Sequence, residues 1–134
     1  MNKPLLLAAA TLGAITAQPS QAAREHIVPA RFGETVFVGP ARVTPLRLLA
    51  DSRCPSEVTC VWRGEVRIAV RVRSAGDYGV REMTLGKAIP LGDGQLELTA
   101  VMPARSANRR ILPADYRFAF RYTGGFQQVR AHRP

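Results

Sequence analysis

Histidine, tryptophan and cysteine are scarce in this sequence of 134 residues, which holds two histidines, one tryptophan and two cysteines. The histidines, His26 and His132, stand near the two ends of the chain, away from any candidate nucleophile in the sequence. No serine lies in a G-x-S-x-G context, and neither a glycine-rich phosphate loop nor an acidic calcium-loop pattern is present. We therefore expect no enzyme, no metal and no cofactor.

Long apolar runs are also absent beyond the N-terminus, whereas crossing a membrane as a helix takes about 20 apolar residues. Lys3 precedes a short apolar run over residues 5–16, and small residues follow up to Ala22. This order is typical of a cleavable signal peptide, residues 1–22. No cysteine lies near the cleavage point, so the sequence has no lipobox for a lipid anchor. We expect a mature domain, residues 23–134, that is periplasmic or secreted and has no transmembrane segment.

Acidic residues are few beside the basic ones, 10 against 19, which gives a formal net charge of +9. Nearly all of the cations are arginines, since Lys3 and Lys87 are the only lysines. Such a balance permits attraction to anionic envelope components or to an acidic protein, although a basic composition by itself says little about specific binding. Nucleic acid is an unsuitable partner for an exported chain. The partner itself is unknown at this stage.

Helical periodicity is missing, and alternation of apolar and polar residues takes its place. In residues 65–73 four aliphatic side chains share one face, and in residues 115–122 four aromatic side chains do so. The opposite faces carry arginines. If the two segments pair in one sheet, these arginines form a possible anion-binding face, unless Glu65, Glu82 or Glu97 interleave with them and make an ordinary solvated face. The arginines concerned are Arg67, Arg71, Arg73, Arg117 and Arg121.

Shorter strand-like segments complete an all-β pattern, for which we predict a single-domain antiparallel β-sandwich, with a partly closed β-barrel as the alternative. Pro29 and Pro45 cannot donate a ladder hydrogen bond, so their segments should be edge strands or carry bulges. Residues 74–79 and the Asp93-Gly94 pair suggest tight turns. Residues 103–113, which are basic and bounded by prolines, should form a loop. The weaker strands are expected over residues 27–31, 34–38, 42–49, 80–85 and 95–99.

The densest stretch is DSRCPSEVTCVWRG, residues 51–64, which holds both cysteines and the tryptophan. In an exported chain Cys54 and Cys60 should form a disulfide. A C-x5-C spacing is not a usual zinc motif, and it differs from the C-x-x-C of oxidoreductases. The disulfide would therefore hold the loop in shape.

Trp62 and Gly64 are interpreted as structural residues. If the alternation of residues 65–73 runs back unbroken, Cys60, Trp62 and Gly64 lie on the buried face, and the indole packs beside the disulfide. Gly64 would then leave space for the indole or mark a bulge. The alternative is an exposed Trp62 that stacks on a sugar, in a sugar-binding protein or a hydrolytic enzyme.

The remaining polar residues of this stretch have two interpretations. Asp51 and its neighbours suit the capping of a turn. Alternatively Arg53, Glu57 and Arg63 form a binding loop on a rigid scaffold. We expect a non-catalytic exported domain with a binding or structural role in the envelope; a protease or hydrolase inhibitor that presents the disulfide-closed loop 54–60 is the alternative.

The order DSRCP followed by Cys60-x-Trp62-x-Gly64 resembles a group of small, uncharacterised exported bacterial proteins and lipoproteins. Residues 31–36 (RFGETV) are similar to an early F-x-x-G-x-x-V segment of that group, and residues 96–116 are similar to its last two strands. The chain departs from the pattern at Arg63, where a small residue is expected, and in lacking the lipobox cysteine. The resemblance implies a small exported domain and transfers no catalytic residue.

Overall fold

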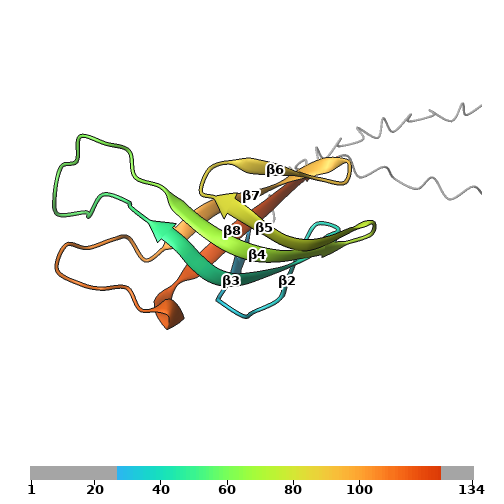
Figure 1. Ribbon diagram of the computed structural model, residues 1–134, viewed down its shortest axis with the longest axis horizontal. Coiled ribbons are helices and arrows are strands. Elements are labelled where there is room, and N and C mark those ends of the chain that lie inside the picture. Colours follow the sequence, from blue (N-terminus) through green and yellow to red (C-terminus); the bar gives the residue numbers. More distant parts are fainter. Residues whose placement is uncertain (1–26, 125–134) are drawn as a thin grey trace, which may run out of the picture.

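The computed structural model describes residues 27–124 (Figure 1). The predicted signal peptide lies outside the described residues. Within them the chain forms eight strands and one short 3-10 turn. The elements are β1 (Val28–Ala30), β2 (Val36–Val38), β3 (Ala41–Asp51), β4 (Val66–Ser74), β5 (Asp77–Thr84), β6 (Ala88–Leu91), β7 (Gly94–Met102), η1 (Pro113–Asp115) and β8 (Arg117–Gly124).

The strands form two antiparallel four-stranded sheets that pack against each other (Figure 1). One sheet has the order β1-β8-β7-β6, and the other has the order β2-β3-β4-β5. The sheets do not close into a barrel. The prediction of an all-β sandwich is therefore confirmed. None of the helical structure in the described residues is long and apolar enough to span a membrane.

The core lies between the sheets and is made by the faces that the alternation predicted. Val66, Ile68, Val70 and Val72 of β4 are fully buried, as are Phe118 and Phe120 of β8. Aliphatic side chains from the neighbouring strands fill the space between them. Burying aliphatic and aromatic side chains removes apolar surface from water, and each one stabilises the fold by about 1.5–3 kcal/mol. The alternation of the two clearest segments thus located the inner face of each sheet.

The prolines occupy the positions that a sheet tolerates. Pro29 lies in β1, which is an edge strand. Pro45 lies in the inner strand β3, where the pairing with β4 shifts between Pro45 and Arg47. Both outcomes were predicted, because a proline nitrogen has no hydrogen for the ladder. Strand β6, which the alternation did not reveal, contains Pro90 and is the other edge of its sheet.

The arginines of the two clearest strands do not meet, which corrects the prediction of one shared arginine stripe. Strand β4 belongs to one sheet and β8 to the other. Because the core faces of the two sheets point toward each other, their outer faces point in opposite directions. The arginines of β4 and those of β8 therefore lie on opposite sides of the sandwich.

Candidate functional site

Two long loops project from the same end of the sandwich (Figure 1). The cysteine loop, residues 52–65, joins β3 to β4, and the arginine loop, residues 103–112, joins β7 to η1. Backbone and side-chain hydrogen bonds connect them, among them one from the Ser56 N–H to the Arg105 carbonyl at 2.9 Å. We call this part of the molecule the paired-loop end.

The cysteine loop is closed by the predicted disulfide. Cys54 and Cys60 are bonded, with their Cα atoms 5.9 Å apart. Between them the Val58 N–H donates to the Pro55 carbonyl, at 3.3 Å, and this bond closes a turn. The segment is therefore a compact turn.

Arg53 points into the protein, which corrects its assignment to an outward binding loop. Its guanidinium makes a two-pronged ion pair with Asp51, at 2.9 Å from Nε and 2.7 Å from Nη2. Its Nη1 donates to the carbonyl oxygen of Val101 in β7, a strand of the other sheet, and to that of Pro103 at the start of the arginine loop. The Arg53 and Asp51 side chains are only 16% and 7% exposed. Arg53 thus ties the base of the cysteine loop to the start of the arginine loop.

Tyr116 completes this buried cluster. Its ring is stacked on Phe118 and meets Phe32 edge to face, and its hydroxyl donates to Asp51 Oδ2 at 2.9 Å. Burial, together with the hydrogen bond to Asp51, raises the pKa of Tyr116 to about 12. Burial opposes the charged form of Asp51, but the hydrogen bonds from Arg53 and Tyr116 outweigh it and lower the Asp51 pKa below its ordinary value. Asp51 is therefore an ionised structural anchor.

Glu57 also belongs to the framework, although it lies at the surface. Its carboxylate accepts hydrogen bonds from the Ser106 hydroxyl and from the Ala107 N–H, the latter at 2.9 Å. These bonds hold the pKa of Glu57 at about 2. The side chain spans the two loops and keeps them together. Of the three predicted binding-loop residues, only Arg63 is exposed without a polar contact in the described structure.

Trp62 is exposed, which corrects its predicted place in the core. The side chain is 64% exposed, and the neighbouring Val61 is 98% exposed. The error came from extending the alternation of β4 backwards, because the strand begins only at Val66. Residues 61–64 have no strand pairing, so their side chains do not follow its parity. The alternative interpretation, in which Trp62 stacks on a sugar, requires an accessible indole, and the structure has one.

Gly64 is structural, as predicted, but for a different reason. A Cβ atom at this position would overlap the carbonyl group of Ser52. The two chain segments approach so closely because the Ser52 N–H donates to the Glu65 carbonyl at 2.9 Å, and the Glu65 N–H donates back to the Ser52 hydroxyl at 3.0 Å. Only glycine fits against this backbone contact.

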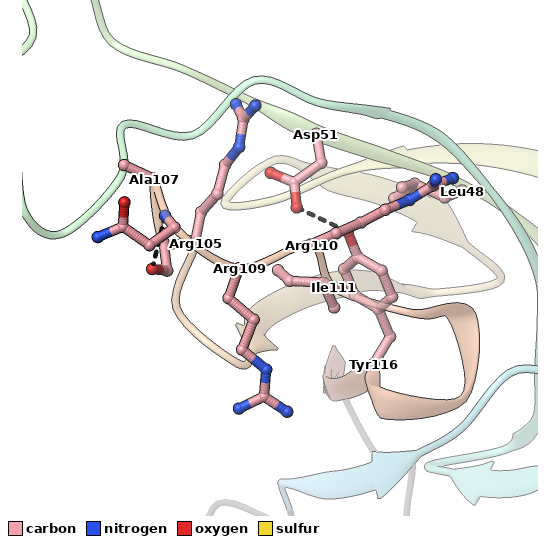
Figure 2. A pocket seen from close by; sticks show the side chains of 10 residues that line it. Leu48, Asp51, Arg105, Ala107, Arg109, Arg110, Ile111 and Tyr116 are labelled. Carbon is pink, nitrogen blue, oxygen red and sulfur yellow. Dashed lines mark hydrogen bonds between the residues drawn. The ribbon is translucent and has the colours of Figure 1, made fainter.

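A pocket of about 490 Å³ opens between the arginine loop and the Asp51–Tyr116 pair. In Figure 2, Arg110 extends across this pair toward Leu48, whereas Arg105 and Arg109 point in opposite directions. Arg105 is engaged, since its Nη1 donates to the Arg53 carbonyl at 3.1 Å. Arg109 and Arg110 are exposed. From the sequence we predicted a basic loop at this position but no functional residue within it. The two adjacent arginines were the signal that could have identified Arg109 and Arg110.

The predicted anion-binding arginines have different surroundings. Arg67 pairs with Glu65 and Glu82, and Arg121 pairs with Glu97. This is the interleaving with acids that the sequence predicted as the alternative. Arg117 donates to the carbonyl oxygens of Ala114 and Tyr116. Arg71 and Arg73 are exposed on the outer face of β4.

Among residues 27–124, no three histidine, cysteine or acidic side chains lie close enough to hold a metal ion. Comparisons of the chain with protein families, with characterised proteins and with solved structures found no match.

Proposed function

We propose that this protein is an exported, non-catalytic domain that binds an acidic partner in the cell envelope through its paired-loop end. The observation that supports this most is the exposed pair Val61 and Trp62 on a loop held by a disulfide. Exposed tryptophan is costly to keep in water, and aromatic anchors on rigid loops are typical of binding sites.

The rigidity of the loops supports binding of this kind. The Asp51–Arg53 pair and the Glu57 contacts fix both loops before a partner arrives. Less conformational entropy is then lost on association, so more of the contact energy contributes to affinity. Arg63, together with Arg109 and Arg110 on the adjacent loop, supplies positive charge at the same end.

The sole tryptophan makes the proposal directly testable by its fluorescence. We expect polygalacturonate and poly-glutamate, as two acidic probes, to shift the emission of Trp62 to shorter wavelength or protect it from acrylamide. Trp62→Ala should weaken binding, measured by calorimetry, about tenfold or more, the loss typical of an interface anchor. Ile27→Ala is the control, because Ile27 is a large apolar residue, 54% exposed, that directly precedes β1 in the other sheet and belongs to neither loop. Unchanged emission with both probes, or full binding by Trp62→Ala, refutes the proposal.

Sugar binding is the second candidate, and the exposure of the indole favours it. A pyranose ring can stack on a tryptophan face without any charge on the ligand. Neutral chito-oligosaccharides would then change Trp62 emission, and replacing Arg63, Arg109 and Arg110 by Ser would leave that response intact. An acidic partner predicts the reverse pattern, since loss of three positive charges would weaken its binding.

A further inference from the structure

A second surface lies at the opposite end of the sandwich, on the outer face of the β2-β3-β4-β5 sheet. Four residues stand side by side across the four strands, in the register Phe37–Arg42–Arg73–Tyr78. We call them the arginine row. Arg42 lies nine residues from Asp51 along β3, which corresponds to roughly 30 Å at the usual rise of a strand. The row is thus separate from the paired-loop end.

The row joins two guanidinium groups to two aromatic rings. Arg42 lies over the ring of Phe37, 5.3 Å from its centroid, and Arg73 lies over Tyr78 at 5.1 Å. Both rings are about two-thirds exposed, at 67% and 68%. Stacking of this kind holds each guanidinium flat against an apolar surface while leaving its N–H donors free.

Within residues 27–124 these two charges are not balanced by an acid. Arg42 and Arg73 are direct cross-strand neighbours, and like charges in such positions destabilise a sheet. In the described part of the chain neither one contacts a carboxylate, whereas Arg67, farther along the same strand, is paired with two glutamates. Arg71, two residues from Arg73 on the same face, adds a third positive charge. An anion between the guanidinium groups would remove the repulsion.

The surface has the shape and the apolar border for such an anion. Phe37, Pro40, Arg42, Arg73 and Ser74 line a shallow hollow of about 460 Å³. Next to it Val80 is 60% exposed. Guanidinium groups bind phosphate oxygens through paired hydrogen bonds, and aromatic rings settle at the boundary between headgroups and acyl chains.

We infer that the arginine row is a docking surface for an anionic phospholipid bilayer, with lipid phosphates held between Arg42 and Arg73. A sheet face that presents arginines between exposed aromatic and aliphatic side chains matches a headgroup layer in charge and in polarity. The predicted export of the chain favours a membrane over nucleic acid, which has the same phosphate chemistry. The surface acts independently of the paired-loop end, and it would hold the domain at a membrane while the loops remain available.

The test is sedimentation of the mature chain with vesicles of phosphatidylcholine that contain one third phosphatidylglycerol, at low salt. We expect binding that pure phosphatidylcholine does not support and that high salt weakens. Arg42→Ser/Arg73→Ser should reduce the binding constant about 10- to 30-fold, because each arginine near an anionic surface contributes substantially to the affinity for the membrane. Arg31→Ser/Lys87→Ser removes the same charge from two exposed positions outside both surfaces and should bind nearly as the unchanged protein does. Thermal denaturation checks that both variants fold.

Three outcomes overturn the inference. Equal loss in the two double variants would show that net charge alone drives binding. Competition by inorganic phosphate at concentrations too low to screen charge would show a site for the free ion. Binding of a single-stranded oligonucleotide through Arg42 and Arg73, without vesicle binding, would assign the surface to nucleic acid. Since the paired-loop proposal is tested through Trp62, either proposal can fail while the other stands.

Discussion

Replacement of Asp51 by Asn is the sharpest test of how the paired-loop end is held together. Asn keeps the size of the side chain and removes its charge. In the native protein the Asp51 carboxylate accepts hydrogen bonds from Arg53 Nε, from Arg53 Nη2 and from the Tyr116 hydroxyl, at 2.7–2.9 Å. The Asn side chain would turn an amide N–H₂ toward one of these donors and leave the Arg53 charge without a counter-charge.

The expected loss of stability follows from the burial of this pair. Breaking a buried ion pair by removing one partner costs about 3–5 kcal/mol. Arg53 is 16% exposed and keeps its hydrogen bonds to two carbonyl oxygens, so the lower end of that range applies. We therefore expect Asp51→Asn to lower the free energy of unfolding by about 3 kcal/mol. Asp115→Asn is the matched control. That side chain makes no polar contact in the described structure, so its effect should stay within about 0.5 kcal/mol.

Urea denaturation followed by far-ultraviolet circular dichroism measures this loss. Tryptophan fluorescence is less suitable, because Trp62 is exposed already in the folded state. Combining Asp51→Asn with Arg53→Met should recover part of the stability, since the uncompensated charge is then absent. A loss below about 1 kcal/mol for Asp51→Asn, or no recovery in the double variant, would refute the assignment of this pair as the anchor of the loops.

The same carboxylate predicts a pH dependence. The folded-state pKa of Asp51 lies below its ordinary value of 3.8, so its contribution to stability is complete above that pH and is lost as the pH falls through the folded-state pKa. Glu57, with a pKa of about 2 in place of 4.5, acts in the same direction. Stability should therefore decline as the pH falls from about 5 toward 2. In Asp51→Asn the decline should be shallower, and equal slopes would contradict the assignment.

Three further variants test the cysteine loop by urea denaturation. Trp62→Ala should change stability by no more than about 0.5 kcal/mol, because the side chain is exposed; a loss of several kcal/mol would place the indole in the core. Gly64→Ala should cost about 3 kcal/mol or more, since its Cβ would overlap the Ser52 backbone, whereas Gly79→Ala, which meets nothing within 4 Å, should be neutral or slightly stabilising. Equal effects at the two glycines would argue against the close contact. Replacing Cys54 and Cys60 by Ala should cost about 2 kcal/mol, as expected for a short closed loop.

Much of the scaffold was predictable from local patterns. The buried faces of β4 and β8 followed from alternation, which depends only on the geometry of an extended backbone. The disulfide followed from the presence of two cysteines in a chain predicted to be exported. The prediction at Pro45 held because a missing N–H disrupts a ladder wherever the strand lies.

The functional surfaces were less accessible to such reasoning. Arg53 resembled a free loop cation, yet its guanidinium reaches carbonyl oxygens about 50 residues away along the chain. Trp62 lay in apparent register with β4, yet the strand starts four residues later. The arginine row joins residues from four strands, and no local pattern states which strands are neighbours.

The sequence by itself thus determined an all-β chain, the inward face of its main strands and the closing of the cysteine loop, since each depends on residues close together along the chain. Only the tertiary structure decided that Arg53 and Glu57 hold two loops together, that Trp62 faces solvent, and that Arg42 meets Arg73 between two aromatic rings. These features arise from strand order and loop packing. Strand order and loop packing both depend on contacts between segments that are distant along the chain. The sequence of one segment does not show which of these contacts form.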